Sequence, residues 1–317
     1  MHIRKSLNQR DSLVTGEQGS LSTASTANRY RISVETGALD VAVAGPEDGT
    51  PLVFHHGSPG SLMLFEPFIE AALARGLRYV SYSRPGYGSS SRQAGRKVAD
   101  CSEGTASIMD QLGADRFFTI GWSGGGPHAL ACAALLPQRV IAASSIASPA
   151  PYLARNLDWQ AGQERGIIEK VQAALSDPDK LQSLLEQEEP KFANLTGDQI
   201  IAALGDLPDV DKAVLSGPLG AFLAENIREA CRNGIWGLFD DNIAFVHDWG
   251  FDLSRIEVPI AVWHGAQDRM VPFAHGQWLA DNVPNAQARL LPEHGHLSIV
   301  IGAFNSILDN LIDSGKR

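Results

Sequence analysis

The stretch FFTIGWSGGGPHALACAALLP, from Phe117 to Pro137, constrains the fold more than any other part of the chain. An apolar run ends at Ser123, which stands among four glycines and is followed by an alanine-rich helical pattern. Because glycine tolerates positive φ and close backbone approach, Gly121 and Gly125 predict a sharp strand-to-helix turn with the serine at its tip. Pro127 fits the first turn of the helix, where its missing N–H is harmless. This G-x-S-x-G arrangement is typical of a nucleophile elbow, so Ser123 is the predicted nucleophile.

Two other interpretations of the glycine-rich turn fit less well. GWSGGGPH has no lysine where a phosphate-binding G-x-x-x-x-G-K-[ST] loop needs one, and it does not follow the first strand, as a dinucleotide fingerprint does. A glycine-rich turn with an incidental serine is the remaining alternative.

Short apolar strand patterns alternate with helical patterns from Tyr30 onward. Strands are expected in RYRISVE, ALDVAVAG, PLVFHHG, LRYVSYS, RFFTIGW, RVIAASSIAS, VPIAVWHG and AQARLLP. This rhythm predicts an α/β fold with a mostly parallel sheet covered by helices on both faces, and an antiparallel hairpin of the first two strands at one edge. Residues 150–256 are helical and acidic instead, which predicts a helical cap inserted into a core of residues 29–149 and 257–317.

Residues 1–28 are rich in serine and threonine and are expected to form a flexible N-terminal extension. They lack the apolar centre of a secretory signal, and no apolar stretch of the chain reaches the length that spans a membrane. The three cysteines, Cys101, Cys132 and Cys231, are far apart, which favours reduced thiols and a cytoplasmic protein.

Acidic residues outnumber basic ones by 36 to 26, giving a net charge of −10. That balance argues against nucleic acid and anionic membrane surfaces as partners, because both repel an acidic protein. A small-molecule substrate is the expected partner, and the composition leaves a homo-oligomer open. No histidine spacing indicates a metal site, and the chemistry below needs no cofactor.

A serine nucleophile needs a general base and an acid, expected in the chain order Ser, acid, His. LLPEHGHLSIV places two histidines between a strand and a helix; His296, directly before the helix, is the predicted base and His294 the alternative. Asp268 follows a strand in VWHGAQDRMVP and is the predicted acid. Three other aspartates fall in the inserted segment and are expected to be solvated: Asp240, Asp241 and Asp248.

Acyl transfer also needs donors for the developing oxyanion. The backbone N–H of Gly124, next to the nucleophile, is the first candidate. The second is the N–H of Ser58 in FHHGSPGS, where Gly57 allows a turn and Pro59 cannot donate.

Four motifs now stand in order along the chain: HGSPG, SRPGYGSSS, GWSGGG and HGAQDRMVP with the later GHL. With them the chain resembles the α/β-hydrolase superfamily from Tyr30 to Ile312. The resemblance implies an eight-stranded sheet with a cap over its carboxyl edge, and a mainly structural role for the loop from Arg84 to Ser90.

The same resemblance implies that Ser123, His296 and Asp268 form a catalytic triad, with the amides of Ser58 and Gly124 as the oxyanion hole. Because the nucleophile is serine, the branches that use aspartate there, epoxide hydrolases and haloalkane dehalogenases, are disfavoured. The predicted activity is cleavage of a small-molecule carboxylic ester, lactone or thioester through an acyl-enzyme.

Two alternatives remain open. The proline-iminopeptidase branch shares an HG-x-PG-like loop and a helical cap, and its cap needs carboxylates to hold an α-amine; the candidates here are Glu186, Glu188 and Glu189. That branch usually has tryptophan where this chain has Gly124. The second alternative is a ligand receptor on the same fold, because fold does not fix function.

Aromatic residues of the predicted cap favour an apolar acyl or alcohol group in the substrate. The pocket candidates are Trp159, Trp236, Phe239 and Trp249, with Phe222 and Phe245 in the same segment. The densest stretch, WGLFDDNIAFVHDWGFD, is expected to face the cleft.

Overall fold

The computed structural model describes residues 27–316, so nearly all of the predicted N-terminal extension lies outside it. Eight strands form one sheet in the order β1-β2-β4-β3-β5-β6-β7-β8. Their bounds are β1 Asn28–Val34, β2 Gly37–Ala44, β3 Thr50–His55, β4 Leu77–Tyr82, β5 Phe117–Trp122, β6 Val140–Ile146, β7 Ile260–Gly265 and β8 Gln287–Leu291. Strand β2 pairs antiparallel with both β1 and β4, whereas β4, β3, β5, β6, β7 and β8 run parallel. The predicted hairpin edge and mostly parallel α/β sheet are confirmed.

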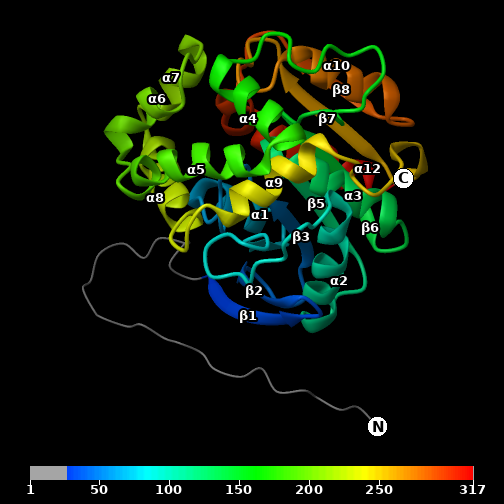
Figure 1. The fold of residues 1–317 in the computed structure, drawn as a ribbon. Helices are drawn as coiled ribbons and strands as arrows, with labels where there is room; N and C mark the ends of the chain where they lie inside the picture. The colour runs from blue at the N-terminus through cyan, green and yellow to red at the C-terminus, as the bar shows by residue number, and fades with distance from the viewer. Residues whose placement is uncertain (1–26, 317) are drawn as a thin grey trace.

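Helices cover both faces of the sheet (Figure 1). Successive residues of a strand point to opposite faces, so Leu52 and Phe54 pack into one apolar cluster and Val53 into the other. The first cluster includes α1 (Glu66–Leu73) and α12 (Phe304–Ser314); the second includes α2 (Cys101–Gln111), α3 (Gly126–Leu135) and α10 (Phe273–Asn282). The parallel strands from β4 to β7 in the sheet order therefore have two buried faces, whereas the edge strand β8 is partly exposed. The carboxyl ends of the parallel strands share one edge.

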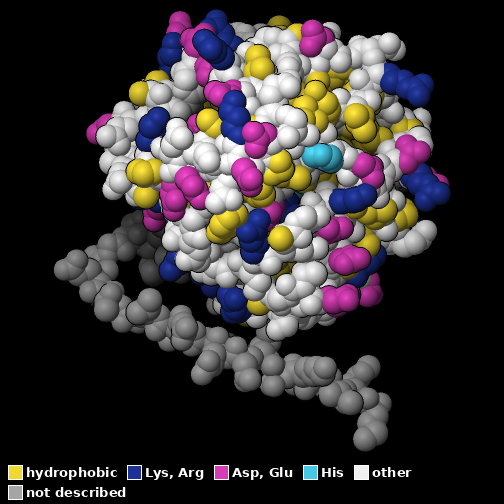
Figure 2. All heavy atoms as spheres, viewed as in Figure 1, with side chains coloured by type: hydrophobic (Ala, Val, Ile, Leu, Met, Phe, Trp, Pro, Cys, Tyr) yellow, Lys and Arg dark blue, Asp and Glu magenta, His cyan; other side chains and the backbone are white. Residues whose placement is uncertain are grey.

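The chain between β6 and β7, all of which the structure describes, carries six α-helices and no strand. These are α4 Arg165–Ser176, α5 Pro178–Ala193, α6 Ile200–Ala203, α7 Asp209–Leu215, α8 Pro218–Ala230 and α9 Trp236–Val246, referred to below as the helical insertion. They lie together, green to yellow, beside the sheet (Figure 1). Acidic and basic side chains are interspersed on the face that carries them (Figure 2). Among residues 27–316, no helix is long and apolar enough to cross a membrane.

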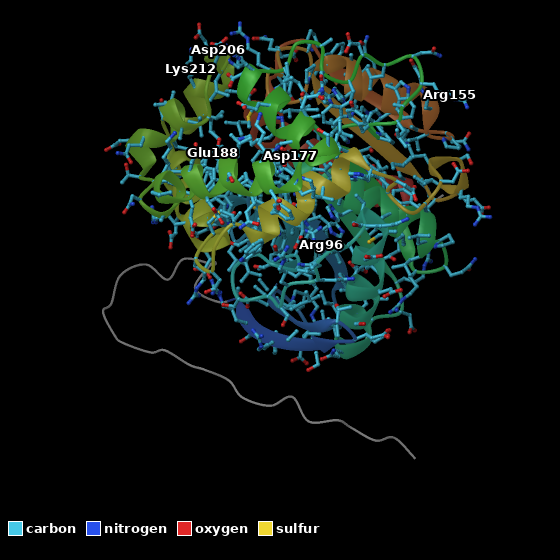
Figure 3. The ribbon with its side chains drawn as sticks, viewed as in Figure 1. Arg96, Arg155, Asp177, Glu188, Asp206 and Lys212 are labelled. Carbon is cyan, nitrogen blue, oxygen red and sulfur yellow. The ribbon has the colours of Figure 1, made fainter. Side chains whose placement is uncertain are left out.

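A buried ionic cluster joins the helical insertion to the core. Asp241 of α9 accepts hydrogen bonds from the guanidinium groups of Arg84 and Arg96, both at 2.6 Å, and from the hydroxyl of Tyr87 at 2.8 Å. Burial alone would raise the pKa of Asp241, but the two guanidinium charges outweigh it and hold that pKa well below its usual range. Arg96 lies beneath α9 in Figure 3. The carboxylate therefore stays charged and ties α9 to the connection between β4 and α2, which carries all three donors.

The expectation that the aspartates of this segment are solvated is wrong for two of the three. Asp241 is fully buried, and Asp240 is 3% exposed in a bidentate pair with Arg92, both bonds being 2.9 Å long. Asp248 is exposed and pairs with Lys97. The arginines that partner the buried aspartates lie about 150 residues earlier in the chain, so the local sequence shows the charges without their partners.

Replacing Asp241 with alanine would leave Arg84 and Arg96 buried without their counter-charge. We expect the free energy of unfolding, measured by urea denaturation, to fall by about 3–5 kcal/mol, as when one partner of a buried ion pair is removed. Asp248→Ala is the matched control, because its ion pair is exposed and should contribute little. Equal losses in the two variants would show that the buried cluster does not stabilise the junction.

Candidate active site

Ser123 sits at the tip of a tight turn between β5 and α3. Its φ is +55°, in the left-handed region that non-glycine residues rarely adopt. A Cβ on Gly121 would overlap the carbonyl of Gly125, and a Cβ on Gly125 would overlap the carbonyl of His55 in β3. Only glycine permits these approaches, and they let the helical turn begin directly at Ser123.

His296 and Asp268 form a buried pair at the carboxyl edge of the sheet. His296 begins α11 (His296–Gly302), and Asp268 lies in the loop after β7. The Nδ1–H of His296 donates to Oδ2 of Asp268 at 2.7 Å, which leaves Nε2 as the basic nitrogen of the ring. The other carboxylate oxygen accepts from the backbone N–H groups of Met270 and Val271 at 2.9 and 2.8 Å.

Each member of this pair shifts the pKa of the other. Burial alone would raise the pKa of Asp268, but the charge of His296 and hydrogen bonds from His264 and His296 outweigh it and hold that pKa well below its usual range. Burial alone would lower the pKa of His296, yet the charge and hydrogen bond of Asp268 and the charge of Asp211 raise it overall. The carboxylate is therefore ionised, and it favours the protonated imidazole.

Ser123 and His296 line one cavity of about 60 Å³. The helical insertion contributes Leu204, Leu223, Asn226 and Ile227 to its wall, three of them apolar. The remaining lining residues are Gly57, Ser58, Pro59, Gly60, Met63, Trp122, Met270 and Leu297. The arrangement brings a serine, an imidazole with a free basic nitrogen and an apolar wall to the carboxyl edge of the sheet.

The loop after β3 lies directly against the serine turn. A Cβ on Gly57 would be 3.4 Å from Cβ of Ser123, and a Cβ on Gly124 would be 3.0 Å from Cβ of Ser58. Ser58 and Gly124, the two predicted oxyanion donors, are thus neighbours beside Ser123.

Arg84 forms hydrogen bonds with the loop after β3. Its guanidinium donates to the backbone carbonyl oxygens of His56 and Gly57, the second at 3.0 Å. It also donates to the hydroxyl oxygen of Ser58 at 2.8 Å. Its backbone N–H donates to Nε2 of His56 at 3.0 Å. Burial, and then the charge of Arg84, hold the pKa of His56 well below its usual range, so this ring stays neutral and can accept that bond. The carbonyls of the loop are therefore engaged by Arg84.

The four aromatic residues predicted to form the pocket are absent from the lining of this cavity. Trp159 donates to the carbonyl of Ala150 at 2.7 Å, and Trp249 to that of Phe245 at 3.2 Å. Trp236 lies under the guanidinium of Arg92 at 4.0 Å, with Phe239 beside it. Trp249 packs in one apolar cluster, and Trp159 and Phe239 pack in another, the commoner role of aromatic side chains.

The aliphatic wall was not anticipated from the sequence, although α8 carries a signal for it. Leu223 and Ile227 are four residues apart and share one face of that helix, which turns toward the cavity. His294, the alternative base, lies against Gly302 at the end of α11. Within residues 27–316, no group of three or more His, Cys, Asp or Glu side chains is arranged to hold a metal ion.

Comparisons with known proteins match the observed fold. Residues 50–303 match the family model for the alpha/beta hydrolase fold. The non-heme chloroperoxidase of Streptomyces lividans is 28% identical over 73% of this chain and 78% of its own length. The bifunctional esterase/perhydrolase of Acinetobacter calcoaceticus is 26% identical over 80% of this chain and 87% of its own length.

A solved structure gives the same result for the fold. The crystal structure of a hydrolase from Pseudomonas aeruginosa superposes with a TM-score of 0.66 at 22% identity, covering 90% of this chain and 98% of that one. With a family model that spans most of the sequence and a sheet of the same type, this chain belongs to the α/β-hydrolase family.

Proposed function

We propose that this α/β-hydrolase enzyme cleaves a small-molecule carboxylic ester through an acyl-enzyme, with Ser123 as nucleophile, His296 as general base and Asp268 as the acid. The observation that carries the proposal is the cavity shared by Ser123 and His296, together with the 2.7 Å hydrogen bond between His296 and Asp268. Lactones and thioesters offer the same reacting carbonyl.

In the proposed reaction, Oγ of Ser123 attacks the ester carbonyl carbon while Nε2 of His296 takes the hydroxyl proton. The ionised Asp268 stabilises the imidazolium that forms, and the N–H groups of Ser58 and Gly124 stabilise the oxyanion. His296 then gives its proton to the departing alcohol. Water, deprotonated by the same nitrogen, hydrolyses the acyl-enzyme and restores Ser123.

The cavity supports a small apolar acyl group. Its wall carries Leu204, Leu223 and Ile227, all from the helical insertion, and its volume is only about 60 Å³. We infer that the insertion acts as a cap that determines acyl-chain length. The name of the Acinetobacter relative, a bifunctional esterase/perhydrolase, supports ester cleavage on this fold.

The peptidase alternative has less support. Glu188 of α5, labelled in Figure 3, pairs with Lys170 at 3.0 Å, and Glu186 accepts from Gln182. Neither these two nor Glu189 line the cavity with Ser123, and none of the described residues that line it is a carboxylate that could hold a substrate amine.

Hydrolysis of p-nitrophenyl acetate, butyrate and octanoate tests the proposal directly. We expect the wild type to favour the short esters and Ser123→Ala to lose turnover. Turnover of proline p-nitroanilide alone would support the peptidase instead. Absence of both turnover and covalent labelling of Ser123 by a fluorophosphonate would contradict an enzyme and favour a receptor.

The pH dependence tests the role of His296. Because its pKa is raised above 6.5 and the base must be neutral, kcat/KM should fall as the pH drops through a midpoint above 6.5. His296→Gln should abolish turnover, whereas His294→Gln should keep the same midpoint. A midpoint at or below 6.5 in the wild type would contradict the pairing of His296 with an ionised Asp268.

The acyl wall can be tested by enlarging it. Leu223→Ala should shift the preference from acetate toward octanoate, because it removes buried apolar volume beside the reacting serine. Trp236→Ala is the control, since Trp236 does not line the cavity. An equal shift in both variants would show that the insertion acts through folding rather than through this wall.

A further inference from the structure

Asp211, on α7 of the helical insertion, reaches the first turn of the helix that begins with His296. Its side chain is fully buried. Oδ2 accepts from the backbone N–H of His296 at 2.8 Å, and Oδ1 accepts from those of Leu297 and Ser298 at 3.1 and 2.8 Å. The first N–H groups of a helix have no partner within it, so a carboxylate from another segment supplies the acceptors here.

The start of α11 has the space that this contact requires. A Cβ on Gly295 would come within 2.5 Å of Oδ2 of Asp211, so glycine leaves room for the carboxylate. The N–H of Gly295 itself donates to Oγ of Ser298 at 2.8 Å. Four consecutive backbone N–H groups, from Gly295 to Ser298, therefore have acceptors, three of them on Asp211.

Two carboxylates from different parts of the chain thus hold one histidine. Asp268, from the loop after β7, fixes the imidazole, and Asp211, 85 residues before His296, fixes its backbone. Apolar packing supports the same junction, because Leu215 at the end of α7 belongs to the same cluster as Leu297. A shift of α7 would change the position of His296 relative to Ser123.

Few charged or titratable side chains lie near enough to His296 to affect its pKa. The carboxylates of Asp268 and Asp211 act on its pKa, and His264 of β7 contacts Asp268 at 3.3 Å. His294 lies two residues earlier, against the end of α11. The remaining charges on and beside α7 are exposed: Asp209, Lys212, and the ion pair of Asp206 with Arg269. Asp206 and Lys212 lie at the outer end of the insertion in Figure 3.

We propose that Asp211 is a positioning residue of the helical insertion, which fixes the backbone of His296 and so makes the geometry of the general base depend on the seating of α7. The role of His296 as base rests on the function proposed above. In this arrangement the insertion lines the cavity and also holds the backbone of the general base in place.

Asp211→Asn tests this directly. Asparagine keeps one oxygen acceptor, presents an NH₂ donor to the remaining backbone N–H and removes the negative charge. We expect kcat/KM for p-nitrophenyl acetate to fall by roughly tenfold to a hundredfold, mainly in kcat, as for a misplaced reacting group. The acid limb of the pH profile, where kcat/KM falls as the pH drops, should move to lower pH, because the charge of Asp211 that helps to raise the pKa of His296 is lost.

Asp209→Asn is the matched control, since Asp209 lies on the same helix but is exposed. It should leave both kcat/KM and the acid limb unchanged. Asp211→Glu keeps the charge but displaces the carboxylate, so kcat should fall with a smaller shift of the limb. This second variant also tests the proposal if Asp211→Asn does not fold, and wild-type kcat in a folded Asp211→Glu would then overturn it.

A titration of the His296 ring by NMR needs no turnover. With the signal assigned from His296→Gln, the pKa of His296 should be lower in Asp211→Asn than in the wild type and in Asp209→Asn. An unchanged pKa together with unchanged kcat/KM in folded Asp211→Asn would overturn the positioning role while leaving the ester hydrolase intact. The shift in pKa without Ser123-dependent turnover in the wild type would instead overturn the proposed function and support the positioning role.

Discussion

The close backbone approach at the end of β5 is the constraint on which the rest of the site depends. Gly121 pairs with His55 of β3, and Gly125 lies against the carbonyl of the same residue. This contact fixes Ser123 at the tip of the turn and brings the loop of Gly57 and Ser58 against it. A side chain at Gly121 would push the end of β5 away from the start of α3, and one at Gly125 would push β3 away from it. Backbone packing therefore comes before any side-chain chemistry here.

The helical insertion contacts the surroundings of Ser123 and His296 through two buried carboxylates. Asp241 of α9 binds the arginine that engages the loop of Ser58, whereas Asp211 of α7 binds the first turn after Gly295. Between them, Leu223 and Ile227 of α8 supply an apolar wall. The same segment therefore contributes buried charge at these two contacts with the core and apolar surface where a substrate would lie.

Local sequence patterns were sufficient for the fold and for the positions of Ser123, Asp268 and His296. Strand alternation, the glycines of the serine turn and the order of the motifs are properties of short windows, and each window places its residue at a strand end. The lining of the cavity and the roles of Asp211 and Asp241 could not be predicted in this way. They depend on contacts between segments 85 and 157 residues apart, which no local pattern contains.

The aromatic residues illustrate the same limit. Their density in the inserted segment indicated apolar surface, but it did not show which side of each helix faces the core. In the structure, Leu223 and Ile227 of α8 face the cavity, whereas Trp159 and Trp249 pack in other apolar clusters.

The pairing of Arg84 and Arg96 with Asp241 has a consequence for how such a chain can diversify. Both guanidinium groups belong to the core and are almost fully buried, and their counter-charge belongs to the insertion. Replacing the whole insertion with that of another protein would leave Arg84 and Arg96 buried without a counter-charge, unless the new insertion placed an aspartate at the position of Asp241. With the acyl wall proposed above, changes of substrate preference are therefore more accessible through single aliphatic replacements on α8 than through exchange of the insertion. A chimera built at the ends of β6 and β7 must carry Asp241 with it.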